Sequence, residues 1–319
     1  MGVSFLTPVA VLFGLLAAVP LAVFVGRRRR IEQVRSALGL SASAGRSWIV
    51  LAICLAAVPV LVGVAAAQPV ITSTRTVPQR SDAEVWVVVD TSRSMLASAG
   101  ADEATRFRRA QDDVIALQEQ LPDVPLGVAS FTDRVLPHLF PTVDRRVFAE
   151  TVREALGIER PPPSTSFGTN VTALDALGAL PTLAFYTPVV EKRALVVFTD
   201  GESQPVSTLA TDFAQEPRID VTFVKMGEGS ERIWESGVSE AAYSPDPAAA
   251  ATLAAAATAV EGQVLEEGQV DEAAAAVRAA LGAGPTTPRR IEGNRQALMP
   301  YVALLAILPL AFVLYRRNV

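Results

Sequence analysis

The chain has 319 residues and a formal net charge of −5; half of its residues are hydrophobic and only 19% are charged. This composition is too apolar for an ordinary soluble protein. Residues 82–282 hold 15 Lys or Arg against 31 Asp or Glu, whereas the remainder holds 13 basic residues against 2 acidic ones. The acidic middle part argues against nucleic-acid binding, which needs a basic surface. The basic remainder suits the anionic lipids of a bilayer.

Three apolar runs predict transmembrane helices, because each approaches the roughly 20 residues that a helix needs to cross the hydrocarbon core. We place these helices at residues 1–26, 48–70 and 297–315. A cleaved signal peptide would carry its positive charges before the apolar run. Here they follow it as Arg27–Arg30, so we expect a retained helix. The single cysteine, Cys54, lies inside the second run and excludes an intramolecular disulfide.

The basic segment 27–47 sets the predicted orientation of these helices. It carries Arg27–Arg30, Arg35 and Arg46 against one acid, Glu32. Short loops rich in arginine stay on the cytoplasmic side of a membrane. We therefore expect a multi-pass protein of the inner or plasma membrane, with residues 82–282 extracytoplasmic. A transporter is not expected, because the three runs contain no ionisable residue that could form an ion path.

The middle part of the chain alternates between strand and helix patterns. Residues 71–83 are polar and predict a short linker. Strands are predicted at 84–90, 124–131, 134–140, 192–199, 219–226 and 262–265, and helices at 103–120, 144–156, 169–185, 247–260 and 271–281. Such alternation predicts an α/β fold, a Rossmann-like, doubly wound and mostly parallel sheet with helices on both faces.

Polar residues follow two of the buried strands at the points where these strands end. Asp90, Ser92 and Ser94 come after the first strand, and Asp200 ends a later one. Ligands collect at the carboxyl ends of strands in such a sheet, and oxygen atoms suit a hard cation such as Mg²⁺. Thr169 stands where a helix is predicted to begin, and a helix amino terminus favours a bound anion. The set predicts a divalent-cation site left open to an outside anion.

These segments carry a resemblance to a known family. VWVVVDTSRSM, SFGTN and ALVVFTDGES resemble the metal-ion-dependent adhesion site (MIDAS) of von Willebrand factor A (VWA) domains. The resemblance implies a VWA fold and a bound Mg²⁺ or Mn²⁺, with an acidic residue of a partner protein as the final ligand. It also implies metal-ligand roles for Asp90, Ser92, Ser94, Thr169 and Asp200.

Two features depart from the family pattern. Arg93 stands where many bacterial relatives have glycine, and we expect it to point outward, toward an acidic partner. The threonine loop is rich in hydroxyl groups, so Thr165 remains an alternative to Thr169.

The segments on either side of the middle part resemble those of bacterial BatA/BatB-type membrane proteins. Two helices precede the domain and one follows it. That resemblance implies a link to other VWA membrane proteins, to MoxR-type AAA+ ATPases, and to envelope or stress functions.

The remaining polar residues predict no second site. His138 is the only histidine, so we expect it to be structural, and Arg106, Arg108 and Arg109 are interpreted as a surface charge run. We therefore expect a non-enzymatic binding module. The alternatives are a Mg²⁺-dependent phosphoryl hydrolase and a membrane scaffold that works without metal. The hydrolase is disfavoured because the chain has only two lysines, Lys192 and Lys225, and no evident base beside the site.

Overall fold

The structure is a computed structural model that describes residues 2–38, 47–160 and 172–318. It divides into two compact units, residues 1–76 with 290–319 and residues 77–289. The divisions fall within two long strands, β2 (Pro69–Arg80) and β11 (Thr286–Ala297). Each unit is described separately.

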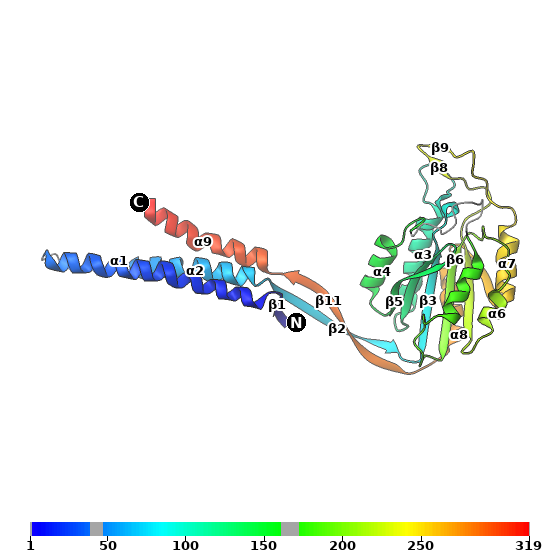
Figure 1. Cartoon of the computed structure of the whole chain (residues 1–319), viewed down its shortest axis with the longest axis horizontal. Coiled ribbons are helices and arrows are strands. Elements are labelled where there is room, and N and C mark those ends of the chain that lie inside the picture. The colour runs from blue at the N-terminus through cyan, green and yellow to red at the C-terminus, as the bar shows by residue number, and fades with distance from the viewer. Residues whose placement is uncertain (1, 39–46, 161–171, 319) are drawn as a thin grey trace. The chain divides into compact units, whose positions relative to one another are not determined.

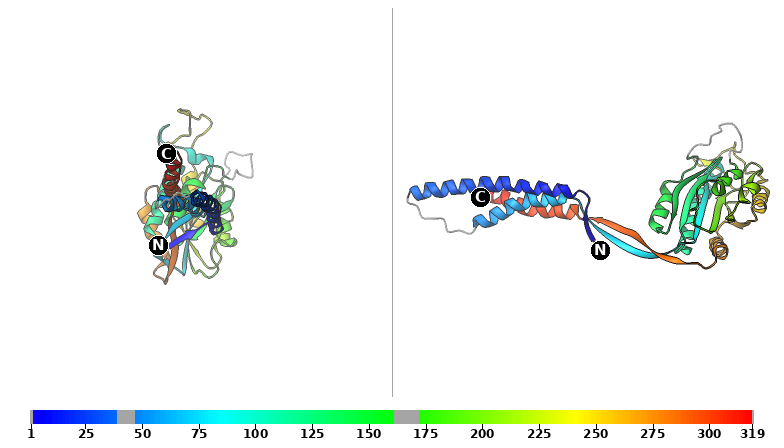
Figure 2. Two further views of the ribbon diagram at one scale, coloured as in Figure 1. Left: turned by 90° about the vertical axis from the view of Figure 1, so that its left-hand side faces the viewer. Right: turned by 60° about the horizontal axis from the view of Figure 1, so that its bottom comes forward.

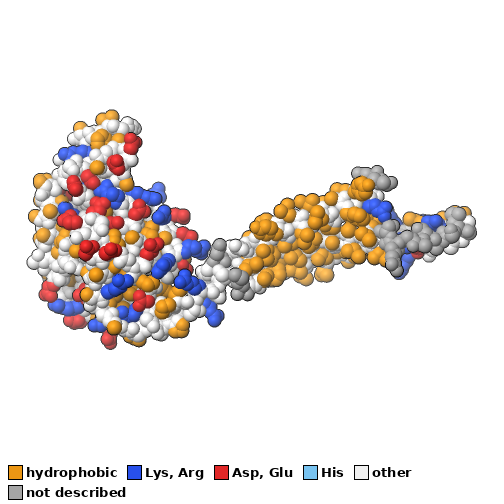
Figure 3. Space-filling model, turned by 180° about the vertical axis from the view of Figure 1, so that it is seen from behind, with side chains coloured by type: hydrophobic (Ala, Val, Ile, Leu, Met, Phe, Trp, Pro, Cys, Tyr) orange, Lys and Arg blue, Asp and Glu red, His pale blue; other side chains and the backbone are white. Residues whose placement is uncertain are grey.

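The first unit is mainly helical (Figure 1). A 3₁₀ helix, η1 (Pro8–Ala17), runs directly into α1 (Ala18–Ala37), and α2 (Ser47–Ala66) packs against both η1 and α9 (Met299–Asn318). In the described part of the chain three helical segments are long and apolar enough to cross a membrane, Pro8–Ala37, Ile49–Ala66 and Met299–Arg316. Figure 3 shows hydrophobic side chains covering these helices on the face in view. Helix α1 continues past the apolar run and includes Arg27–Arg30.

A small sheet in this unit differs from the sequence prediction. Strand β1 (Gly2–Phe5) pairs antiparallel with the start of β2, and β2 lies between β1 and β11. The first apolar run therefore begins as a strand, and residues 71–80, predicted as a linker, belong to β2. The two units divide within this segment, but the sequence prediction missed the strand because its partner β11 lies about 200 residues further along the chain, where no local pattern reveals it.

The second unit contains a six-stranded sheet with the order β10-β7-β6-β3-β4-β5. Figures 1 and 2 show this sheet with helices packed against it. Its strands are β3 (Ala83–Asp90), β4 (Leu126–Phe131), β5 (Val135–Thr142), β6 (Lys192–Thr199), β7 (Ile219–Lys225) and β10 (Gln263–Glu266). All neighbouring pairs are parallel except β4 with β5. The predicted mostly parallel α/β fold is confirmed.

Side chains of the central strand alternate between two cores. Val85, Val87 and Val89 pack in one core, whereas Trp86 and Val88 pack in the other. This period of two is that of a strand covered on both faces. The first core is closed by α3 (Arg106–Gln120), α4 (Arg145–Glu154) and α8 (Val270–Leu281). The second is closed by η3 (Leu174–Gly178), α5 (Ala179–Thr182), α6 (Leu209–Phe213) and α7 (Ala249–Ala259).

The helix predicted at 169–185 is much shorter in the structure. Its described part consists of the 3₁₀ helix η3 and the single turn α5. Pro181 lies inside α5. Proline lacks the N–H that a longer helix would use and clashes with the preceding turn. The segment accordingly forms two short helical pieces in place of one long regular helix.

A close contact between neighbouring strands gives a test of the core. A Cβ atom on Gly127 of β4 would lie 2.8 Å from the indole ring of Trp86, which is fully buried. We expect Gly127→Ala to lower the free energy of unfolding by about 1–3 kcal/mol, because the indole cannot move without disturbing the core. Urea unfolding measures this change. Gly100→Ala is the control, since its Cβ would meet only a flexible glutamate side chain at 3.5 Å.

Candidate metal site

Asp90 is the last residue of β3 and its side chain is fully buried. Its carboxylate accepts two short hydrogen bonds. The backbone N–H of Ser92 donates to Oδ1 at 2.8 Å, and the Thr199 hydroxyl donates to Oδ2 at 2.6 Å. The first bond closes a tight turn after the strand, and the second joins β3 to β6. The carboxylate is thus held in one orientation at the carboxyl edge of the sheet.

The two serines lie on the turn that follows this strand. Ser92 precedes η2 (Arg93–Leu96), and Ser94 lies within it. Their Oγ atoms are 2.9 Å apart. A single short turn therefore brings both hydroxyl groups close together, as the spacing of two residues predicted.

Asp200 follows β6, which is the parallel neighbour of β3. Gly201 comes next with a φ of +79°, and a Cβ there would lie 2.7 Å from the carbonyl oxygen of Ala249. Only glycine accepts both conditions without strain. This turn leaves Asp200 buried, with Oδ1 accepting from the backbone N–H of Glu202 at 3.0 Å.

Burial and the neighbouring carboxylate both act on Asp90. Burial raises the pKa of Asp90, the negative charge of Asp200 raises it further, and the hydrogen bonds from Thr199 and Ser92 oppose the change. The resulting pKa is about 7, against an ordinary value of 3.8. A buried carboxylate whose charge is disfavoured in this way would gain from a bound cation.

Arg106 is the counter-charge that the sequence patterns did not reveal. Only 2% of its side chain is exposed. Its Nη1 donates to Asp200 Oδ2 and to Glu202 Oε1, both at 3.0 Å, and its Nε donates to Glu231 Oε2 at 2.6 Å. The interpretation of Arg106 as a surface charge was therefore wrong. Its acidic partners lie 94 to 125 residues away in the sequence, so no local signal identifies them.

Thr199 was also missed, although a signal existed. It directly precedes Asp200, and the register of β3 and β6 pairs Val89 with Phe198. The next residues along the two strands, Asp90 and Thr199, therefore lie opposite each other. The parallel alignment of the two predicted strands would have been enough to find it.

The residues at this edge suit a hard divalent cation. Carboxylate and hydroxyl oxygens are the ligands that Mg²⁺ accepts. In the described residues no group of three or more His, Cys, Asp or Glu side chains is placed to hold a metal ion. Hydroxyl groups would therefore complete the shell around Asp90 and Asp200. Thr169 and its alternative Thr165 lie outside the described residues.

Arg93 lies between the two serines, and its side chain is 55% exposed. It points away from the core, but its Nη2 donates to Glu240 Oε2 of the same chain at 2.7 Å. The expected outward orientation is therefore found, with an intramolecular partner.

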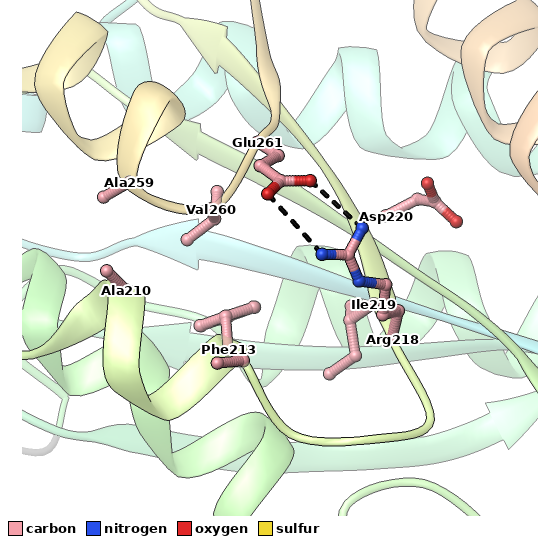
Figure 4. A pocket seen from close by; sticks show the side chains of 9 residues that line it. Ala210, Phe213, Arg218, Ile219, Asp220, Ala259, Val260 and Glu261 are labelled. Atoms are coloured by element: carbon pink, nitrogen blue, oxygen red, sulfur yellow. Dashed lines mark hydrogen bonds and ion pairs between the residues drawn. The ribbon is translucent and has the colours of Figure 1, made fainter.

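A separate hollow of about 130 Å³ lies beside the start of β7 (Figure 4). Apolar side chains such as Phe213 and Val260 line it together with the ion pair of Arg218 and Glu261, whose Nη1 and Oε2 atoms are 3.0 Å apart. Because β7 is parallel to β6, this hollow is at the sheet edge opposite Asp200. It includes none of the predicted site residues.

Comparison with known proteins agrees with the fold. The von Willebrand factor type A domain family model matches residues 85–202, whereas no curated protein matches the sequence. Among solved structures, BatB from Bacteroides thetaiotaomicron has 19% identity and a TM-score of 0.50, covering 62% of this chain and 98% of its own. An aerotolerance-related membrane protein from Bacteroides fragilis has 20% identity and a TM-score of 0.49, with the same two coverages.

A manganese-loaded TRAP protein from Plasmodium vivax is more distant. Its identity is 13% and its TM-score 0.40, with 70% of this chain and 83% of that protein covered. The family match and the observed sheet order lead to the same assignment. The chain therefore carries a von Willebrand factor type A domain, which shares its fold with BatB.

Proposed function

We propose that this chain is a membrane-anchored binding protein whose VWA domain captures an acidic residue of a partner protein through a divalent cation. The cation would be Mg²⁺ or Mn²⁺, held by Asp90, Ser92, Ser94, Thr169 and Asp200. The observation that carries the proposal is the convergence of two buried carboxylates and two hydroxyl groups at one sheet edge. When bound, the cation would supply positive charge with a coordination position open to an outside carboxylate.

Some residues of the site would bind the cation, and others would orient or neutralise the ligands. Hydroxyl groups are neutral ligands, so Ser92 and Ser94 would leave much of the positive charge uncompensated. Thr199 fixes the Asp90 carboxylate from the neighbouring strand. Arg106 neutralises part of the Asp200 charge, which keeps the site short of negative charge. Such a shortage favours an additional anionic ligand from a partner.

The membrane placement completes the proposal. The three apolar helices would cross the inner or plasma membrane, with the basic residues of α1 on the cytoplasmic side and the VWA domain outside. This layout resembles the one that the sequence comparison with BatA/BatB-type membrane proteins led us to expect. We therefore infer partners among other VWA membrane proteins or a MoxR-type AAA+ ATPase system, and a role in envelope or stress-related assembly.

A binding role agrees better with the site than phosphoryl hydrolysis does. A hydrolase needs a cationic side chain free to hold the transferred phosphate. Arg106 is buried and bonded to three carboxylates, so it does not present its charge to a ligand. We therefore propose that the protein is not an enzyme.

Metal titration of the full chain in lipid nanodiscs tests the proposal. We expect wild type to bind Mg²⁺ or Mn²⁺ by calorimetry and Asp200→Asn to bind it at least about tenfold more weakly, because one ionised ligand is lost. Asp220→Asn is the matched control, since Asp220 is an exposed carboxylate at the opposite end of the neighbouring strand.

Partner capture is measured with the same proteins. Crosslinking in membranes, with and without chelator, should yield partner adducts that chelator and Asp200→Asn remove. Adducts that persist unchanged under both conditions would support the metal-independent scaffold instead. Absence of metal binding by wild type would contradict the proposal at its first step.

A further inference from the structure

An exposed arginine stands between the two serines of the candidate metal site. Arg93 opens η2, directly after Ser92 and directly before Ser94. Its side chain is 55% exposed, and its Nη2 lies 2.7 Å from Glu240 Oε2. Among the residues that the structure describes, this is the one hydrogen bond that the guanidinium makes. An arginine carries five N–H donors in a planar fork, so most of them remain available to a second acceptor.

Glu240 is held in place by the segment that carries it. This segment follows the hairpin of β8 (Trp234–Glu235) and β9 (Val238–Ser239), and the backbone N–H of Glu240 donates to Ile233 O at 2.8 Å. Further along, the Tyr243 hydroxyl donates to Glu202 Oε1 at 2.7 Å.

Backbone hydrogen bonds join the segment that contains Glu240 to the residues that follow η2. Ser98 and Arg232 exchange two backbone hydrogen bonds, of 2.9 and 3.0 Å. A carboxylate of the chain itself is thus presented to the arginine of the metal turn.

The charges around Arg93 are acidic. The hydrogen bond from Arg93 to Glu240 raises the pKa of the arginine, and the charges of Glu240, Glu159 and Glu235 add to this effect. Glu159 is close because its backbone N–H donates to Thr91 O, beside the metal turn, at 2.7 Å. Arg93 is therefore an exposed cation whose acidic neighbours belong to the same chain, and a carboxylate of a partner must compete with them for it.

We propose that Arg93 is a second anchor for the acidic partner segment. Glu240 competes with that segment for the Arg93 guanidinium. This inference rests on the proposed cation-dependent capture. One carboxylate of the partner would complete the cation shell, and a neighbouring carboxylate would bind the Arg93 fork. Glu240 holds the same guanidinium in the free protein, so it weakens binding of the second carboxylate. The partner chemistry is a protein segment with at least two nearby Asp or Glu residues.

A double-mutant cycle on the full chain in nanodiscs tests this inference. The probe is a fluorescein-labelled Glu-Gly-Glu-Gly-Glu peptide with its ends blocked, and the readout is fluorescence anisotropy in Mg²⁺ or Mn²⁺. We expect Arg93→Gln to raise Kd about three- to tenfold and Glu240→Gln to lower it about two- to fivefold, as befits half-exposed ion pairs. Glu240→Gln in the Arg93→Gln background should have no further effect, because the glutamate acts through the arginine.

Two controls separate this effect from general electrostatics. Glu235→Gln removes a nearby acid that makes no hydrogen bond to Arg93 among the described residues, and it should change Kd less than about twofold. A peptide with a single glutamate should bind wild type and Arg93→Gln nearly equally. All these positions are at least partly exposed, and unchanged thermal unfolding would show that the variants fold.

The outcomes distinguish this inference from the function on which it rests. Peptide binding that chelator does not reduce, or no binding to wild type, would overturn cation-dependent capture and the inference with it. Chelator-sensitive binding that is equal in wild type and Arg93→Gln would overturn the second anchor alone. Equal gains from Glu240→Gln and Glu235→Gln would overturn the competitor role.

Discussion

Asp90→Asn should abolish divalent-cation binding and at the same time stabilise the metal-free domain. The carboxylate is fully buried beside Asp200, and its pKa of about 7 shows that its charge is disfavoured in the fold. Asparagine has nearly the same shape and no charge, so it removes the repulsion but also an ionised ligand. We expect Asp90→Asn to raise the free energy of unfolding by a few kcal/mol at pH 8 without metal, since each unit of pKa difference corresponds to about 1.4 kcal/mol.

The pH dependence follows from the direction of this shift. The folded state holds the Asp90 proton more tightly than the unfolded state does, because the folded pKa lies above the ordinary 3.8. The contribution of this group to stability is therefore largest below pH 4 and falls as pH rises from about 4 to about 7. A divalent cation binds the ionised form, so added Mg²⁺ should restore stability mainly above pH 7.

Thermal unfolding at pH 5 and pH 8, in chelator and in Mg²⁺, measures these effects on the full chain. The wild type should lose stability between the two pH values by more than Asp90→Asn does. Added Mg²⁺ should restore the stability of the wild type at pH 8 but not change that of Asp90→Asn. Asp220→Asn serves as the exposed control and should behave as wild type. A Mg²⁺ response that survives in Asp90→Asn would show that the cation binds elsewhere.

Arg106→Met should be among the most destabilising single substitutions in the domain. The guanidinium is the shared partner of Asp200, Glu202 and Glu231, and its Nη2 also donates to Glu228 O at 2.9 Å. Methionine fills similar volume but leaves three buried carboxylates without this cation. Breaking a buried ion pair from one side costs about 3–5 kcal/mol. We expect Arg106→Met to lower the free energy of unfolding by this amount, as measured by urea unfolding at pH 8.

The neighbouring arginine provides the control for this prediction. Arg109 also pairs with Glu231, but a quarter of its side chain is exposed. Arg109→Met should therefore cost only about 1 kcal/mol. The loss in Arg106→Met should shrink toward pH 5, because burial and the charge of Asp200 already raise the pKa of Glu202. Without the arginine its carboxyl group would take up a proton more readily. Equal losses for the two arginine variants would contradict a special role for Arg106.

Local patterns in the sequence were sufficient for much of the fold. The apolar runs predicted the three candidate membrane helices, and continuous β-branched runs predicted the buried strands β3 and β6. These signals are local, because burial on both faces of a strand or within a lipid core demands apolar residues at every position. The positions of Asp90, Ser92, Ser94 and Asp200 directly after those strands were likewise enough to predict that they share one sheet edge. Their role as cation ligands remains a prediction.

Only the tertiary structure decided which distant residues meet. It paired β2 with β11, brought Arg106 under Asp200, and set Glu240 against Arg93. The partners in each case are far apart in the chain, so no periodicity or spacing in either segment encodes the contact. Two arginines illustrate the difference. They are the same residue type in the sequence, yet Arg106 is buried and Arg93 is 55% exposed. Burial depends on what packs over a residue, and that is a property of the folded chain.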